Sequence, residues 1–74
     1  MNGATVKHIR EKLGLSREDL AELLCLSGYR TMMNIETDFR RPGKLAIRLL
    51  RYLDSIPKSK ALRLIEELNR HKPI

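Results

Sequence analysis

Apolar side chains recur every three or four residues along most of the chain, which is the spacing of one buried face of an α-helix. Val6, Ile9 and Leu13 predict a first helix over residues 6–13. Thr5 can cap its start with a side-chain oxygen, and Gly14 can end it in the left-handed conformation. The chain is therefore expected to open with a short amphipathic helix that stops at a sharp turn.

The next stretch predicts two helices joined by a very short connection. Ser16 can cap a helix that runs to about Leu24, and Ser27 can cap another that ends near Glu36. The expected inward side chains of the two helices are Leu20, Leu23, Met32 and Ile35. Only residues 25–27 lie between the helices, so we expect them to cross steeply rather than to run antiparallel.

Two further helices complete the pattern and set the fold class. They are expected over residues 43–54 and from Lys58 to about His71, with a break around Pro57. The expected inward side chains of the first are Ala46, Leu49, Leu50 and Leu53. The second carries an apolar stripe of Leu62, Ile65 and Leu68, which Ala61 and Leu64 widen. Leucine is abundant and β-branched residues are few, a balance that favours an all-α fold.

The composition limits the class of protein. Seventy-four residues, of which 42% are hydrophobic, suffice for one small core, so we expect a single domain over residues 1–74. The longest apolar run, residues 23–26, is far shorter than the ~20 residues that a membrane span needs. Cys25 is the only cysteine, which excludes an internal disulfide and a cysteine-based zinc site. A soluble, cytoplasmic protein is the expectation.

Charge is distributed unevenly along the chain. There are 15 Lys and Arg residues against 9 Asp and Glu, and the whole net charge of +6 falls in residues 38–74. Residues 39–53 contain no acid and five cations, which are Arg40, Arg41, Lys44, Arg48 and Arg51. Such a block favours a polyanionic partner, most often nucleic acid. It also fits an ordinary solvated face, so charge alone leaves both interpretations open.

A recognisable motif covers the two closely spaced helices. Residues 10–24 read R-E-K-L-G-L-S-R-E-D-L-A-E-L-L, and the pattern continues with Met32, Ile35, Glu36 and the run Arg40-Arg41-Pro42. Over about residues 6–54 this resembles the Cro/repressor-type (XRE) helix-turn-helix family. The resemblance implies a five-helix, lambda-repressor-like DNA-binding domain. Its helix-turn-helix would span about residues 16–36, and the second helix of the motif would enter the major groove.

Three positions depart from the family pattern. Cys25 and Asp38 stand where the family usually has glycine. Cys25 would then need a strained or re-formed turn, whereas aspartate visits the left-handed conformation more readily than most residues. One extra residue, which we place at Gly28, leaves the register of the third helix open by one position.

The third helix is expected to read base edges. Arginine pairs with guanine and asparagine with adenine, and an apolar tip can touch the thymine methyl group. The expected base contacts are Tyr29, Arg30, Met33 and Asn34, with Tyr29 or Thr31 at the specifying position instead of Arg30 if the register differs by one. The resemblance implies phosphate contacts at Arg17, Ser27, Arg40, Arg41, Lys44 and Arg48. It also implies a structural ion pair between Arg10 and Glu36.

These expectations combine into a sequence-specific transcriptional regulator of double-stranded DNA. We expect a repressor, which could act on its own promoter, bound to a palindromic site as a homodimer. The fifth helix either closes the core or forms the dimer interface through its stripe of Leu62, Ile65 and Leu68. The chain also resembles small phage and mobile-element regulators, among them anti-CRISPR-associated autorepressors. The alternative is an antitoxin or a protein-interaction adaptor built on the same fold.

The residue inventory does not support an enzyme. His8 and His71 lie far apart in the sequence, and neither has cysteine or carboxylate neighbours at metal-ligand spacing. The chain contains no glycine-rich phosphate loop and no nucleophile motif. We therefore expect no catalytic residues, no metal, no cofactor and no small-molecule ligand.

Overall fold

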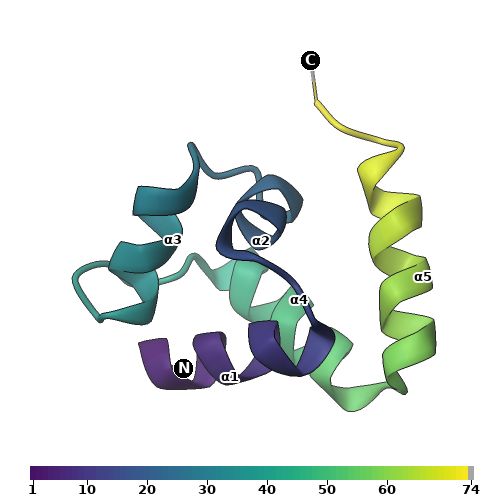
Figure 1. The fold of residues 1–74 in the computed structure, drawn as a ribbon, viewed down its shortest axis with the longest axis horizontal. Helices are drawn as coiled ribbons and strands as arrows, with labels where there is room; N and C mark the ends of the chain where they lie inside the picture. The colour runs from purple at the N-terminus through teal and green to yellow at the C-terminus, as the bar shows by residue number, and fades with distance from the viewer. Residues whose placement is uncertain (74) are drawn as a thin grey trace.

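Five α-helices make up the part of the chain that the computed structural model describes, residues 1–73 (Figure 1). They are α1 (Gly3–Leu13), α2 (Arg17–Leu23), α3 (Tyr29–Glu36), α4 (Lys44–Ser55) and α5 (Lys58–Asn69). No strand occurs within the described residues, which confirms the all-α class and the number of helices. No helix of residues 1–73 is long and apolar enough to cross a membrane.

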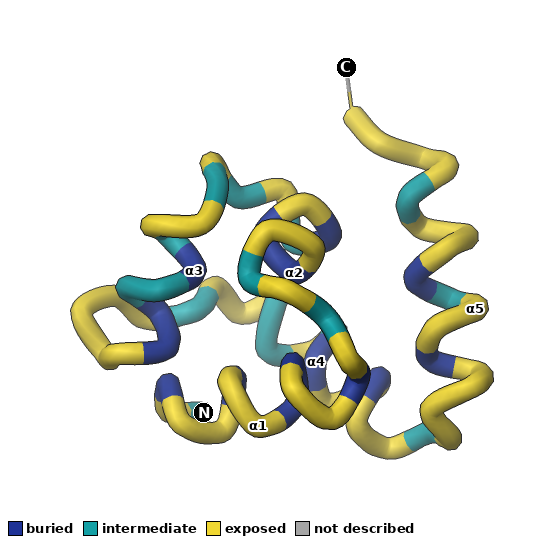
Figure 2. Tube along the Cα trace, viewed as in Figure 1, coloured by how far each residue is buried: buried dark blue, intermediate teal, exposed yellow. Residues whose placement is uncertain are grey.

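Every helix contributes side chains to one hydrophobic core. The buried apolar residues are Val6, Ile9 and Leu13 of α1, Leu20, Ala21 and Leu23 of α2, Met32 and Ile35 of α3, Leu50 and Leu53 of α4, and Ala61 and Ile65 of α5. Figure 2 shows these buried stretches turned toward the middle of the molecule, with exposed residues on the outer turns. The periodicity of the sequence therefore identifies the inward face of each of the first four helices.

The start of α1 differs from the prediction. The helix begins at Gly3 rather than at residue 6, and its cap is Asn2, whose Oδ1 accepts a hydrogen bond from the amide of Thr5 at 2.9 Å. Thr5, the predicted cap, lies inside the first turn and donates its hydroxyl to the same Asn2 oxygen. Gly3 sits directly against α3, because a Cβ at this position would lie 2.3 Å from the carbonyl oxygen of Glu36.

The helices α1, α2 and α3 end with the same backbone motif. The residues that follow, Gly14, Cys25 and Asp38, have φ angles of 73°, 57° and 66°, all in the left-handed region. In each case two amides donate back to carbonyls of the last helical turn, as the Leu26 amide does to the Ala21 carbonyl at 2.8 Å. Cys25 and Asp38 thus adopt, with a side chain, a conformation that glycine adopts without steric cost.

The connection from α2 to α3 is longer than predicted. Ser16 caps α2 as expected, in a reciprocal pair of hydrogen bonds with Asp19. Residues 24–28 lie outside both helices, and the residue before α3 is Gly28, with a φ of 148° and no side chain to cap the helix. Ser27 is therefore not the cap; its hydroxyl instead bonds to the Thr31 hydroxyl at 2.6 Å.

The fifth helix ends earlier than predicted and buries less of its stripe. It stops at Asn69, two residues before His71. Ile65 is only 7% exposed and belongs to the core, whereas Leu62 and Leu68 are each 38% exposed. The sequence predicts that the stripe either closes the core or forms a dimer interface. Ile65 closes the core, and its side chain leaves little surface for a second subunit.

Candidate nucleic-acid interface

The helix α3 turns one face to the core and the opposite face to solvent. Met32, Ile35 and Glu36 are buried, whereas Arg30 is exposed and Met33 and Asn34 are half-buried. With about 3.6 residues per turn, Arg30, Met33 and Asn34 share the side opposite the buried residues. Three of the four predicted base-reading residues therefore lie together on one outward surface.

Tyr29 and Thr31 flank this surface rather than occupy its middle. Tyr29 is exposed at the first position of α3, and Thr31 is half-buried with its hydroxyl bonded to Ser27. One turn past Asn34, Thr37 is exposed and donates its hydroxyl to the Met33 carbonyl at 2.9 Å. Thr37 extends the outward face of α3 beyond the predicted base contacts. The sequence could have indicated this, because Thr37 is seven residues from Arg30 and residues so spaced share a face of a helix.

The carboxylate of Glu36 lies inside the protein at the end of α3 and is held by an arginine of α1. Its side chain is 2% exposed, and its Oε2 lies 2.6 Å from Nε of Arg10. A second nitrogen of Arg10 donates to Oε1 at 3.3 Å, and a third donates to the Leu15 carbonyl at 3.0 Å. The two-pronged geometry satisfies a buried charge that would otherwise be costly to remove from water.

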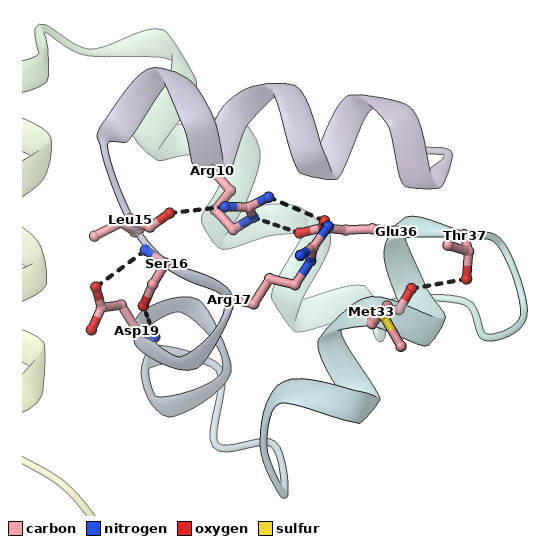
Figure 3. Close-up of polar contacts among 8 residues, drawn as sticks. All are labelled: Arg10, Leu15, Ser16, Arg17, Asp19, Met33, Glu36 and Thr37. Atoms are coloured by element: carbon pink, nitrogen blue, oxygen red, sulfur yellow. Dashed lines mark hydrogen bonds and ion pairs between the residues drawn. The ribbon is translucent and has the colours of Figure 1, made fainter.

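A second arginine reaches the same carboxylate from α2. Arg17 Nε lies 3.0 Å from Glu36 Oε1 (Figure 3). The guanidinium of Arg17 also lies 5.6 Å from the centre of the Tyr29 ring. The hydrogen bond to Glu36 raises the pKa of Arg17 above its ordinary value. The sequence predicts Arg17 as a DNA phosphate contact, but it does not predict the contacts of Arg17 with Glu36 and Tyr29.

These contacts fix both ends of α3 against the first two helices. Tyr29, at the start, stacks under Arg17, and Glu36, at the end, is held by Arg10 and Arg17. Just past the helix, the Asp38 side chain accepts a hydrogen bond from the Gly3 amide at 2.8 Å, which places a negative charge at the start of α1. The outward residues of α3 therefore stand on a helix whose position is determined at each end.

A cationic segment follows α3. The loop and the outer side of α4 carry five exposed cations, which are Arg40, Arg41, Lys44, Arg48 and Arg51. Within residues 1–73, none of them lies within ion-pairing distance of a carboxylate, whereas Arg10, Lys12 and Arg17 all do. The charge of this segment is thus available to a partner outside the chain.

The other titratable side chains form no comparable site. His8, His71 and Cys25 are all exposed, and they lie on α1, past the end of α5, and in the α2–α3 connection. In the part of the chain that is described, no three His, Cys, Asp or Glu side chains come together as metal ligands would. The cluster around Glu36 is the most connected group of charges among the described residues, and its arginines leave it positively charged.

No protein-family model matches this chain, and no solved structure matches it significantly. The function is therefore inferred from the geometry of α3, the cationic segment beside it and the motif in the sequence.

Proposed function

We propose that the protein is a sequence-specific double-stranded DNA-binding regulator in which α2 and α3 act as a helix-turn-helix. In this proposal α3 enters the major groove and reads base edges with Arg30, Asn34 and Met33. Arginine and asparagine offer bidentate hydrogen bonds to guanine and adenine, and the methionine tip offers an apolar surface to thymine. The main support is that these three side chains lie together on the outward face of α3.

The cationic segment would position the protein on the DNA backbone. Arg40, Arg41 and Lys44 come directly after α3 in the chain and carry no ion pair among the described residues. Arg48 lies one turn further along α4. Phosphate contacts from such residues fix orientation without reading sequence. Arg17 would contribute less to the backbone than the motif implies, because its guanidinium is already bonded to Glu36.

A homodimer that occupies a palindromic promoter would repress by excluding polymerase, and no second domain is required for this. Two copies related by a two-fold axis would present two α3 helices about one turn of DNA apart, roughly 10–10.5 base pairs between half-site centres. Leu62 and Leu68 of α5 are the exposed members of the predicted dimer stripe. Such a regulator could act on its own promoter.

Selection of bound duplexes from a random pool tests this proposal. We expect the wild-type chain to enrich an inverted repeat with the half-site spacing given above. The matched control is the variant Arg30→Ala/Asn34→Ala, which keeps the core and the cationic segment and should enrich no motif. Equal enrichment by both proteins, or no motif from either, would contradict sequence reading by α3.

A further inference from the structure

One side of α4 carries apolar side chains that are exposed or only partly covered by the core. Leu45 is 76% exposed and Tyr52 is 52% exposed, while Leu49 and Ile56 are half-buried. Leu45, Leu49 and Tyr52 fall at positions i, i+4 and i+7, so they form one row along α4, and Ile56 follows directly after the end of the helix. We call these four residues the α4 strip.

A groove continues the strip toward α5. Its volume is about 390 Å³, and its lining consists of Tyr52, Ile56, Lys60, Arg63, Leu64 and Glu67. The tyrosine, isoleucine and leucine supply an apolar floor, and the tyrosine is a residue type that is enriched in the energetic centres of protein interfaces.

The charge of the groove indicates the kind of partner. Lys60 and Arg63 carry no ion pair among residues 1–73, whereas Glu67 has Arg70 beside it at 3.4 Å. The groove therefore presents positive charge around an apolar floor. A second copy of this chain would bring the same excess of positive charge to the groove, and like charges oppose self-association there. An acidic partner would instead complement Lys60 and Arg63.

The groove lies away from the outward face of α3. Figure 1 shows α3 and α5 on opposite sides of the molecule, so a segment bound along α5 need not cover the outward face of α3. The groove borders the predicted dimer stripe, because Leu64 and Leu68 are four positions apart and share a face of α5, whereas Leu62 lies on another face.

We propose that the α4 strip and this groove bind an acidic amphipathic helix of another protein. Apolar side chains of that helix would pack on Tyr52, Ile56 and Leu64, and its Asp or Glu residues would pair with Lys60 and Arg63. This is the helix-in-groove mode, in which apolar anchors supply affinity and flanking charges set orientation. The inference adds a protein partner to the proposed DNA-binding function and does not depend on it.

A synthetic peptide tests the site on the intact protein. The probe has about 14 residues, four helical turns, with Leu and Phe at helical spacing and Glu elsewhere; its control has the same composition in scrambled order. Fluorescence anisotropy should show saturable binding of the probe alone. Lys60→Glu/Arg63→Glu should weaken that binding by roughly tenfold or more. Arg40→Glu/Arg41→Glu changes the net charge equally outside the groove and should weaken it by less than about threefold.

Three results would overturn the proposal. They are equal binding of both peptides, equal loss in both charge-reversal variants, and no saturable binding of the helical probe. Tyr52→Ser supplies a fourth outcome, since this exposed position tolerates a polar side chain: dissociation of a wild-type dimer by this change would assign the strip to a second copy instead. Because DNA binding is measured separately, failure here leaves the test of α3 unaffected.

Discussion

Arg10 donates a hydrogen bond to each carboxylate oxygen of Glu36: its Nε lies 2.6 Å from Oε2, and a second guanidinium nitrogen lies 3.3 Å from Oε1. The pair joins the end of α3 to the last turn of α1, and Arg17 of α2 adds a second arginine to the same carboxylate. A carboxylate buried this deeply depends on its partners, because an isolated charge in the core would be expensive to hold away from water.

We expect Glu36→Gln to be the most destabilising of the conservative polar substitutions. It removes the charge that both arginines face, and breaking a buried ion pair in this way costs about 3–5 kcal/mol. Urea denaturation followed by circular dichroism measures the loss. The control is Lys12→Ala, which breaks the exposed pair with Asp54 and should cost no more than about 1 kcal/mol. Similar losses of unfolding free energy in the two variants would show that the Glu36 ion pairs do not hold α3 to α1 and α2.

The two left-handed non-glycine residues should respond differently to glycine. Cys25→Gly should stabilise the fold by about 0.5–1 kcal/mol, because it relieves the side-chain strain and breaks no contact. Asp38→Gly relieves the same strain but also removes the hydrogen bond to the Gly3 amide. Loss of such a hydrogen bond to an amide at a helix start costs about 1 kcal/mol, so the second change should give no gain or a net loss. Equal stabilisation by both would mean that the hydrogen bond from the Gly3 amide to Asp38 does not stabilise the fold.

Gly3→Ala should destabilise the protein although alanine is the better helix former. The new methyl group would lie 2.3 Å from the Glu36 carbonyl oxygen, so α1 and α3 must separate. Overpacking of this kind typically costs about 1–3 kcal/mol. Gly43→Ala is the matched control, because nothing lies within 4 Å of a Cβ at that position. It should shift the midpoint of urea denaturation much less than Gly3→Ala does. A stabilised Gly3→Ala protein would contradict the close approach of the two helices.

The sequence predicted the parts of this fold that depend on local pattern. Helical spacing located the five helices, and the residue type of Ser16 correctly predicted the cap of α2, which depends on residues close together in the sequence. The start of α1 was predicted too late because glycine is a poor helix former. The reason for a glycine at position 3 is its close contact with α3, which the local sequence does not show. Ser27 has the residue type of a cap, but α3 begins only at Tyr29, directly after Gly28, so the Ser27 side chain is one residue too early to cap it.

The candidate site could be predicted where neighbours in sequence determine it. The outward face of α3 follows from helical periodicity once Met32 and Ile35 are placed inside. The position of Arg17 between Glu36 and Tyr29 joins side chains from two helices, and no local pattern encodes that contact. The exposure of Leu62 and Leu68 beside buried Ile65 likewise depends on how α5 packs against the other helices.

Assembly gives a fourth prediction. We expect a homodimer, and Leu62→Ser/Leu68→Ser should shift it toward monomer because both side chains are partly exposed on the single chain. Sedimentation velocity measures the change, and Leu45→Ser, on the far more exposed α4 strip, is the control that should leave the dimer intact. Wild-type protein that remains monomeric at tens of micromolar, with and without operator DNA, would rule out this interface.

The central claim is that α3 reads the base sequence while the cationic segment after it contacts the DNA phosphates. The most direct test titrates two variants on preferred and scrambled duplexes at several salt concentrations. Arg30→Ala should cost about 1–3 kcal/mol on the preferred duplex and relax discrimination at one base position per half-site. Arg41→Ala should weaken both duplexes alike and flatten the log-log salt dependence by roughly one unit per contact, hence about two per dimer. Equal losses on both duplexes for alanine at Tyr29, Arg30, Thr31, Met33 and Asn34 would show that this helix does not read sequence.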